Sequence, residues 1–427
     1  LCSQYQVTPD NRTWTIYLEP NAAFSDGTRV TVQDVVASYE QARQNVYYKG
    51  RFTHIARVEL SSDGGVDFFL DTPYQNLALL LDIPIVKASE VTVDNPLGTG
   101  PYSLEDGIGG KHLQRVVGWW CSSDDLVAKD SSIALVEAES PSQIRDEFEF
   151  SGLSVVCTNP QTDSYADYRC DFELWEVDSG FMMYIGCNVT YSKFFDDGTL
   201  RTFLTYGIDR QTLVDDNYGG LALPTTLPIS PMSPYYSKSL AANYDYDEMR
   251  FIDAASKFRV PTNDKGVPRT LQLLVNSDDS ARLRCARNIA ATLTELGLAC
   301  ETVESPTSVY EARLQAANYD IYLGITKLPT TADLSEFYRP WGEMSWGGLA
   351  NETIYNMVNQ SLADRGNYYN LHKLVADDGR IIPVMAGYYA IYAKRGVLSD
   401  LNPARDNVFY YTLGKTMESS KVATQFS

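Results

Sequence analysis

The sequence predicts an α/β protein with more than one domain, and three observations support this class. The chain has 427 residues, which is the length of two or three ordinary domains. A strand–helix–strand pattern lies in its second half, and the first half is richer in pairs of strands. Apolar residues make up 44% and charged residues 21% of the chain, a composition typical of globular proteins rather than disordered ones.

The clearest pattern lies between residues 271 and 303. Leu271–Val275 is an apolar run that predicts a strand, and Ser277, Asp278 and Asp279 are suitable N-caps for a helix directly after it. Apolar residues then recur at helical spacing from Leu283 to Leu296, and Gly297 ends the helix. A second strand begins at Leu298. This arrangement is the unit of a parallel sheet with a right-handed crossover.

The pattern continues with a helix over 308–317 and a strand over 320–324, so we predict an α/β domain from about 235 to 380. In the first half, residues 12–19 alternate in polarity as a half-buried strand does. Thr31 and Asp34 form a capping-box pattern that predicts the start of a helix. Asp63-Gly64-Gly65 separates two short strands and predicts a hairpin.

The charge balance disfavours nucleic acid as a partner. Lys and Arg number 35 against 55 Asp and Glu, which gives a formal net charge of −20. Such a surface repels phosphate backbones and anionic lipids. The longest uncharged apolar run is Ile381–Ala393, which is shorter than the roughly 20 residues that span a bilayer.

Catalytic and metal-binding motifs are absent from the sequence. It contains no nucleophile elbow, Walker loop, zincin motif, dinucleotide-binding fingerprint or C-x-x-C. The three histidines, His54, His112 and His372, are far apart along the chain. We therefore predict no enzymatic activity, no cofactor and no metal site. Cys157 and Cys170 are compatible with a disulfide or with buried free thiols, so the redox compartment stays open.

Five blocks occur in a fixed order along the chain. They are Trp14-Thr15-Ile16-Tyr17-Leu18 with Phe24-Ser25-Asp26-Gly27-Thr28 and Asp34-Val35-Val36; Gly98-Thr99-Gly100-Pro101-Tyr102; Leu200-Arg201 with Tyr206-Gly207-Ile208-Asp209-Arg210; Gly219-Gly220 with Leu227-Pro228-Ile229-Ser230-Pro231; and Tyr244-Asp245-Tyr246-Asp247 with the strand–helix–strand unit after it. Together they resemble the family 5 extracellular solute-binding proteins over nearly the whole chain.

The resemblance implies a two-lobed clamshell of the type II, cluster C-like periplasmic binding proteins, with mixed sheets and an extra subdomain. It implies a first lobe over 1–233 with the subdomain at about 12–95, a second α/β lobe over 234–382, and a return to the first lobe over 383–427. The chain would cross between lobes near Pro231–Tyr236 and Ile381–Pro383. In the family, a few dozen residues with first-lobe strands precede the Trp14 block, so we expect this chain to be a trimmed piece.

The resemblance also implies a function. We expect an extracytoplasmic, monomeric substrate-binding protein of an ABC importer, free in a periplasm or lipid-anchored, that closes two lobes around an oligopeptide and meets the permease subunits. One alternative is a receptor for a metal chelate or another small solute. A second is a sensor or adhesin that uses the same fold without transport. A two-lobed hydrolase is disfavoured because no nucleophile motif is present.

In peptide-binding members of this family, an Ala-Asp pair after a second-lobe strand presents the aspartate to the peptide's α-amino group. Ala332-Asp333 occupies the comparable place, although Thr326–Thr331 departs from the family's Trp-containing lead-in. The alternative role for Asp333 is helix capping or surface solvation. Aromatic residues are expected to line the rest of the site, with core packing as the alternative for each. These candidates are Trp119, Trp120, Trp175, Tyr184, Tyr338, Trp341 and Trp346.

Overall fold

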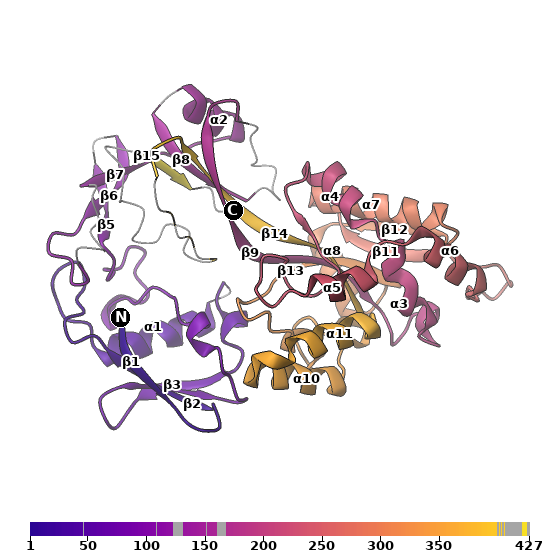
Figure 1. Ribbon diagram of the computed structural model, residues 1–427, viewed down its shortest axis with the longest axis horizontal. Helices are drawn as coiled ribbons and strands as arrows, with labels where there is room; N and C mark the ends of the chain where they lie inside the picture. The colour runs from indigo at the N-terminus through magenta and orange to yellow at the C-terminus, as the bar shows by residue number, and fades with distance from the viewer. Residues whose placement is uncertain are drawn as a thin grey trace. The chain divides into compact units, whose positions relative to one another are not determined.

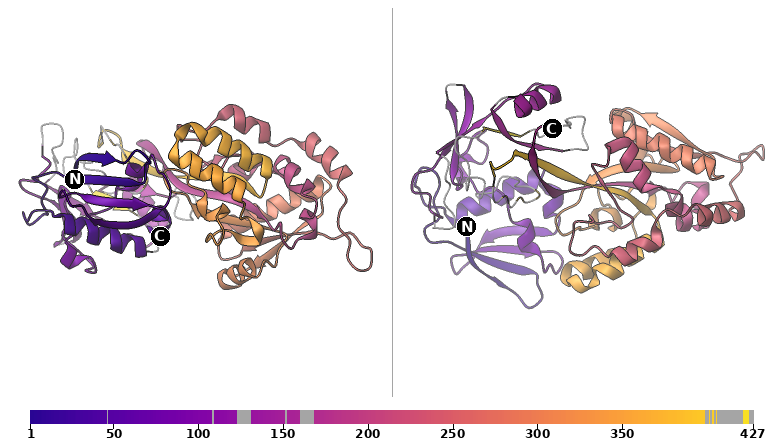
Figure 2. Two further views of the ribbon diagram at one scale, coloured as in Figure 1. Left: turned by 90° about the horizontal axis from the view of Figure 1, so that it is seen from below. Right: turned by 45° about the horizontal axis from the view of Figure 1, so that its top comes forward.

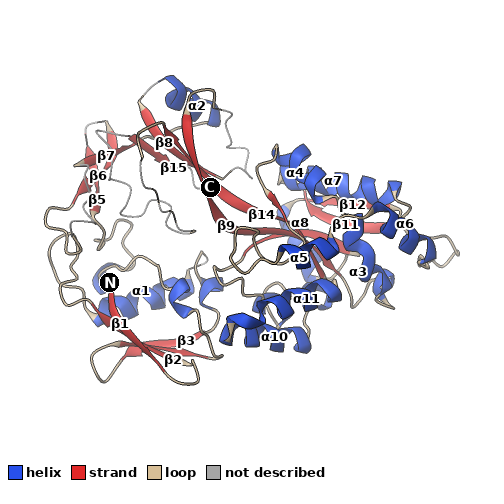
Figure 3. Ribbon diagram, viewed as in Figure 1, coloured by secondary structure: helices blue, strands red, loops and turns tan. Residues whose placement is uncertain are grey.

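Two long strands, β9 (Phe172–Cys187) and β14 (Ile381–Lys394), join the two units of this computed structural model (Figure 1). Unit 1 comprises Leu1–Val177 and Tyr389–Ser427, and unit 2 comprises Asp178–Tyr388. The mixed α/β class that the sequence predicts is confirmed (Figure 3). The structure describes residues 1–45, 47–107, 109–122, 131–150, 152–159, 168–398, 401, 403, 405 and 421–424.

The units change at other positions than the crossings expected from the sequence. The predicted first crossing at 233–234 lies inside unit 2, and the chain enters that unit at 177–178, within β9. The return falls at 388–389 within β14, after the predicted 382–383. Pro231–Tyr236 is instead a series of turns, in which the Ser233 N–H donates to the Ser230 carbonyl at 2.9 Å. Tyr235 and Tyr236 pack against an apolar cluster of unit 2 around Leu227.

Unit 1 contains a four-stranded antiparallel sheet in the order β1-β2-β4-β3. Its strands are β1 (Cys2–Val7), β2 (Thr13–Leu18), β3 (Ile55–Leu60) and β4 (Val66–Leu70). Helix α1 (Val32–Gln44) contacts β3 and β4 and covers one face of this sheet (Figure 2). The capping box is present, because the Thr31 N–H donates to Asp34 Oδ2 at 2.8 Å and the Asp34 N–H to Thr31 Oγ1 at 3.4 Å.

A second set of strands in unit 1 follows the Gly98–Tyr102 block. In spatial order it runs from the end of β14 through β8, β15, β7 and β6 to β5. The hairpin of β5 and β6 is antiparallel, whereas β15 runs parallel to both β7 and β8. The elements are β5 (Tyr102–Gly107), β6 (Gly110–Arg115), β7 (Ser132–Leu135), α2 (Pro141–Phe150), β8 (Leu153–Thr158) and β15 (Lys421–Thr424).

Unit 2 is built on the strand order β12-β11-β13-β9-β14, with the short β10 (Leu223–Pro224) on β14. The strand–helix–strand prediction is confirmed: β11 (Leu271–Asn276), α7 (Ser280–Glu295) and β12 (Cys300–Ser305) follow one another, and β11 and β12 are parallel. Helix α8 (Thr307–Gln315) leads on to β13 (Ile321–Lys327), which is parallel to β11 and antiparallel to β9. Asp279 caps α7 by accepting a hydrogen bond from the Arg282 N–H at 2.9 Å.

The remaining helices of unit 2 pack around this sheet. They are α3 (Thr199–Phe203), α4 (Arg210–Tyr218), α5 (Lys238–Ala241), α6 (Glu248–Lys257), α9 (Ser335–Tyr338), α10 (Glu352–Ala363) and α11 (Tyr368–Asp378). The core joins α7 to the Tyr206–Arg210 block, and Gly207 shows how close that packing is. A Cβ at Gly207 would lie 2.6 Å from the Phe251 ring and 2.8 Å from Leu293, so only glycine fits. Within the described residues, no helix has the length and apolarity that a membrane span requires.

Arg210 is a buried cation that holds unit 2 together. Its side chain is 4% exposed, and burial lowers its pKa to about 10. Nε donates to the Pro383 carbonyl at 2.9 Å, and Nη1 donates to the carbonyls of Thr205 and Ile208. Nη2 donates to Thr205 Oγ1 at 2.8 Å. The guanidinium therefore links the Tyr206–Arg210 block to β14, which is distant in the sequence.

Replacement of Arg210 by Met should leave these carbonyls buried without donors. We expect the free energy of unfolding to fall by about 3–5 kcal/mol, because each buried acceptor that loses its donor is costly. Urea unfolding followed by circular dichroism measures this change. Arg287→Met, at an exposed ion pair with Glu304 on the same unit, is the matched control and should leave the midpoint nearly unchanged. Equal midpoints for the two variants would show that Arg210 has no structural role.

His372 makes the stability of unit 2 depend on pH. Its ring on α11 has no exposed surface, and neither ring nitrogen has a hydrogen-bond partner among the described residues. Burial lowers the pKa of His372 from 6.5 to about 4. The unfolded chain therefore binds a proton below pH 6.5 that the folded chain does not bind until about pH 4.

The contribution of neutral His372 to the free energy of unfolding should be complete above pH 6.5. It should decline as the pH falls toward 4. At pH 4.5 the cost relative to pH 7 is about 2–3 kcal/mol from this group. His372→Leu should be less sensitive to acid than the wild type by this amount in urea unfolding at the two pH values. His112→Gln, at a half-buried histidine of unit 1, should keep the wild-type pH dependence. An unchanged pH dependence in His372→Leu would contradict the assignment.

Candidate functional site

Asp333 lies on the loop that follows β13. Lys327, the last residue of β13, pairs with Phe181, and the Leu328 N–H donates to the Gly180 carbonyl at 2.9 Å. The loop therefore starts at the end of the sheet where β9 enters unit 2. Tyr368 Oη donates to the Thr331 carbonyl at 2.7 Å, which fastens the loop to α11.

The backbone of this loop is strained next to Asp333. Ala332 has a φ of +50°, a left-handed conformation that costs a non-glycine residue about 1–2 kcal/mol, and its side chain is buried. Asp333 Oδ1 accepts hydrogen bonds from the Ser335 N–H at 2.8 Å and from Ser335 Oγ at 2.6 Å, at the start of α9. These bonds close a local turn directly before α9, whose N-cap position is Leu334. A carboxylate held in this way has a fixed direction, which suits the recognition of a cation.

Trp341 stands on a second strained loop. Its φ is +61° and its side chain is 97% exposed. Glu336 holds the loop together: its carboxylate accepts from Arg339 Nη2 at 2.9 Å and from the Glu343 N–H at 2.9 Å. A Cβ at Gly342 would lie 2.2 Å from the Glu336 carbonyl oxygen, so the loop closes only with glycine there. The fold therefore presents the indole of Trp341 to solvent on a fixed support.

Trp346 lies on the segment between α9 and α10 and is partly exposed. Gly347, its neighbour, accepts a hydrogen bond from the Val189 N–H at 2.8 Å, and Val189 follows the last residue of β9, Cys187. The same segment also contacts α9, because the Met344 N–H donates to the Glu336 carbonyl at 3.1 Å and the Asn351 N–H donates to the Tyr338 carbonyl at 2.9 Å. It therefore links α9, which follows Asp333, to the residues after β9.

Tyr184 and Tyr338 are interior residues of unit 2. Tyr184, on β9, is 3% exposed, and its ring centroid lies 5.0 Å from that of Phe337 and 5.7 Å from that of Tyr322. Tyr338 has no exposed surface. Core packing, the alternative stated for both residues, is what this placement supports. The sequence pattern does not distinguish the two roles, because aromatic residues serve equally in cores and in binding sites.

Trp119, Trp120 and Trp175 belong to unit 1. The indole N–H groups of Trp119 and Trp120 both donate to the Thr99 carbonyl at 2.9 Å, so this pair supports the Gly98–Tyr102 block. Trp119 is buried, whereas Trp120 is partly exposed. Trp175 lies on β9, also partly exposed.

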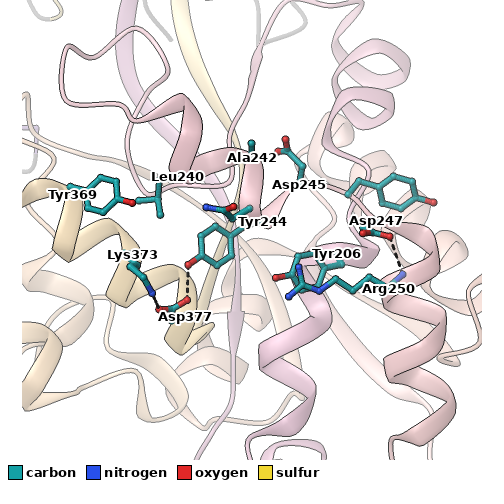
Figure 4. A pocket seen from close by; sticks show the side chains of 12 residues that line it. Tyr206, Leu240, Ala242, Tyr244, Asp245, Asp247, Arg250, Tyr369, Lys373 and Asp377 are labelled. Atoms are coloured by element: carbon teal, nitrogen blue, oxygen red, sulfur yellow. Dashed lines mark hydrogen bonds and ion pairs between the residues drawn. The ribbon is translucent and has the colours of Figure 1, made fainter.

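One pocket of about 550 Å³ lies wholly within unit 2 and contains none of the eight predicted residues (Figure 4). It is formed by Tyr206, the loop before α6, and one face of α11. The sequence feature that lies at this pocket is the Tyr244–Asp247 block. That block is part of the family resemblance, and its residue pattern does not by itself predict a binding site. The lining residues are Tyr206, Leu240, Ala242, Asn243, Tyr244, Asp245, Tyr246, Asp247, Arg250, Tyr369, Lys373 and Asp377.

The chemistry of the described residues does not suggest a metal centre. Among them, no three histidine, cysteine or carboxylate side chains gather closely enough to hold a metal ion. All seven cysteines are free, including Cys157 and Cys170. Burial raises the pKa of Cys157 and Cys285 to about 12, which leaves both thiols protonated and unreactive at neutral pH.

The fold resembles solved structures of solute-binding proteins. It matches a putative peptide binding protein, AppA, from Clostridium difficile with a TM-score of 0.77 and 16% identity over 96% of this chain and 90% of that one. NikA from Brucella suis, solved in complex with Fe(III)-EDTA, gives a TM-score of 0.74 and 17% identity over the same shares of the two chains.

Sequence relatives agree with the structural ones. A probable D,D-dipeptide-binding periplasmic protein, DdpA, of Escherichia coli K12 is 22% identical over 96% of this chain and 83% of its own length. The glutathione-binding protein GsiB of Salmonella typhi is 25% identical over 57% of this chain and half of its own length. The family model for the bacterial extracellular solute-binding proteins, family 5, matches residues 1–348. With the α/β fold described above, this match establishes that the chain belongs to the family 5 bacterial extracellular solute-binding proteins.

Proposed function

We propose that this protein is the substrate-binding component of an ABC importer and that its ligand is an oligopeptide with a free amino terminus. The observation that carries the peptide assignment is Asp333, a carboxylate fixed beside the strained Ala332 at the end of β13. An ammonium bound there gains a charge-assisted hydrogen bond. The names of the relatives, which bind a D,D-dipeptide and glutathione, support a peptide-like ligand.

The partners and location follow from the same proposal. A solute-binding protein acts outside the cytoplasmic membrane, free in a periplasm or held by a lipid anchor, and delivers its ligand as a monomer to permease subunits. The similar protein CtaP from Listeria monocytogenes is titled an ABC transporter substrate binding protein, which supports the transport role. Of the predicted aromatic residues, the exposed Trp341 and the partly exposed Trp120, Trp175 and Trp346 stay candidates for ligand contact.

A metal-chelate receptor is the second candidate. NikA from Brucella suis was solved with Fe(III)-EDTA and NikZ from Campylobacter jejuni with Ni(L-His), and both share this fold. The described residues of this chain contain no cluster of metal ligands, so a chelate would have to be held through its organic part. Mass spectrometry of the ligand that co-purifies with the protein distinguishes a peptide from a chelate.

Asp333→Asn tests the peptide assignment directly. Asn keeps the Oδ1 that accepts from Ser335 and therefore preserves the start of α9, but it removes the charge. We expect binding of a tetrapeptide, selected from a random library, to weaken by about 2–5 kcal/mol in calorimetry. N-acetylation of that tetrapeptide should weaken wild-type binding similarly, and both changes together should cost less than their sum.

Arg287→Met is the control for the Asp333 experiment, because it removes a charge at an exposed ion pair of the same unit and leaves the Asp333 carboxylate and its turn in place. It should bind the tetrapeptide as the wild type does. If Asp333→Asn binds the free and the acetylated peptide with unchanged affinities, Asp333 is not the anchor for the amino terminus. The peptide assignment then loses its residue-level support, whereas the family assignment does not.

The absence of nucleophile and metal motifs predicts binding without turnover. A random peptide library incubated with the pure protein should yield bound peptides of unchanged mass in chromatography with mass spectrometry. Protease inhibitors and a mock purification control for contaminants. Cleavage products that persist through both controls would overturn the receptor proposal.

A further inference from the structure

The pocket of about 550 Å³ in unit 2 has the size of a small-molecule site. Tyrosines and charged side chains line it, and they come from Tyr206 before α4, from the residues between α5 and α6, from α6 and from α11 (Figure 4). The rings of Tyr246 and Tyr369 are both partly open to solvent, with 36% and 48% exposure. All of the lining residues belong to unit 2, so the site depends on that unit alone.

Three of the charged groups are already engaged within the protein. Lys373 forms an ion pair with Asp377, and Tyr244 Oη donates to Asp377 Oδ1 at 2.6 Å. These contacts hold the pKa of Asp377 below its usual value, although its burial acts in the opposite direction. Asp247 Oδ1 accepts a hydrogen bond from the backbone N–H of Arg250 at 2.9 Å, and Asp247 therefore caps α6.

Arg250 and Asp245 are the two charged groups that are not engaged in this way. The guanidinium carbon of Arg250 lies 3.7 Å from the centre of the Tyr206 ring, so the guanidinium contacts that ring at cation–π distance. Among the described residues, no carboxylate lies within ion-pair distance of that guanidinium, and no cation lies within that distance of Asp245. The nearby Arg210 attracts Asp245 electrostatically but does not donate a hydrogen bond to it. The N–H groups of the Arg210 side chain donate to backbone carbonyls and to Thr205 Oγ1 instead.

We propose that this pocket is a binding site for a zwitterion of amino-acid size, separate from the site around Asp333. The ligand's carboxylate accepts hydrogen bonds from the edge of Arg250, and its ammonium pairs with Asp245. An apolar or aromatic ligand side chain lies against Tyr246 or Tyr369. In the view of Figure 4, Asp245 and Arg250 lie on one side of Tyr244 and the Lys373–Asp377 pair on the other.

The charge pattern favours a zwitterion over an ion of either sign. An anion would meet Asp245, Asp247 and Asp377 on a protein with a net charge of −20. A simple cation would leave the Arg250 edge unpaired and would lie near Lys373. A zwitterion satisfies both open groups with charge-assisted hydrogen bonds, which are stronger than neutral ones. The proposal does not depend on the transport role proposed above.

Calorimetric titration with L-phenylalanine and two capped analogues tests the site. L-phenylalaninamide lacks the carboxylate, and N-acetyl-L-phenylalanine lacks the ammonium. Wild-type protein should bind phenylalanine at least five-fold more tightly than either analogue. Arg250→Gln should bind phenylalanine no more tightly than the wild type binds the amide. Asp245→Asn should bind phenylalanine no more tightly than the wild type binds the acetylated compound. Each variant removes the protein group that pairs with the charge missing from that analogue.

Two further variants separate this site from the peptide site. Lys257→Gln, at an exposed ion pair with Asp253 on the same helix, should bind phenylalanine as the wild type does. Asp333→Asn should also leave phenylalanine binding unchanged. Absence of phenylalanine binding, or equal affinities of Arg250→Gln and the wild type, would overturn the proposal. Binding that is lost in Asp333→Asn and kept in Arg250→Gln would also overturn it, and would place the amino acid at the Asp333 site.

Discussion

The antiparallel pairing of β13 with β9 is the constraint on which the site of unit 2 depends. Seven registered pairs, from Ile321 opposite Cys187 to Lys327 opposite Phe181, fix the two strands against each other. Consecutive side chains of β13 from Ile321 to Gly324 are buried, so both faces of the strand are packed and the register decides which side chain meets which neighbour. The same register decides where the loops at the two ends lie. It places the start of the Asp333 loop where the chain enters the unit, and it places Gly347 beside Val189 near the far end of β9.

Buried polar groups add a second constraint, and they differ in how well they are satisfied. The Arg210 guanidinium is surrounded by carbonyl and hydroxyl oxygens, so its burial is compensated by hydrogen bonds. The His372 ring lies in the same unit without a hydrogen-bond partner among the described residues, so it is stable there only in its neutral form. Arg210 therefore holds distant segments of the chain together, while His372 limits the pH range in which unit 2 is most stable.

Two arrangements of polar groups in unit 2 suit a charged ligand. Asp333 is a single carboxylate aimed by a strained backbone, which suits one cationic group on a ligand. The pocket beside α6 offers an open guanidinium and an open carboxylate among tyrosine rings, which suits a ligand that carries both charges. The tight loop under Trp341 is a third fixed support, but it presents an apolar side chain. Strain at Ala332 and Trp341 marks both loops as places where the backbone conformation serves the side chain.

The local sequence determined much of this protein. The capping box at Thr31 and Asp34, the hairpin at Gly64 and the succession from β11 to β13 depend on neighbouring residues, so their pattern predicted them correctly. The family blocks predicted the fold, because they record many such local rules in order. The tertiary structure alone decided which aromatic residues are interior, since Tyr184 and Trp341 have similar chemistry and opposite exposure. The chain passes from unit 1 to unit 2 in the middle of β9. The sequence does not indicate this point, because a strand that continues across it shows no break in composition. The charges around Tyr206 meet only through the packing of α6 and α11, and no spacing along the chain records that contact.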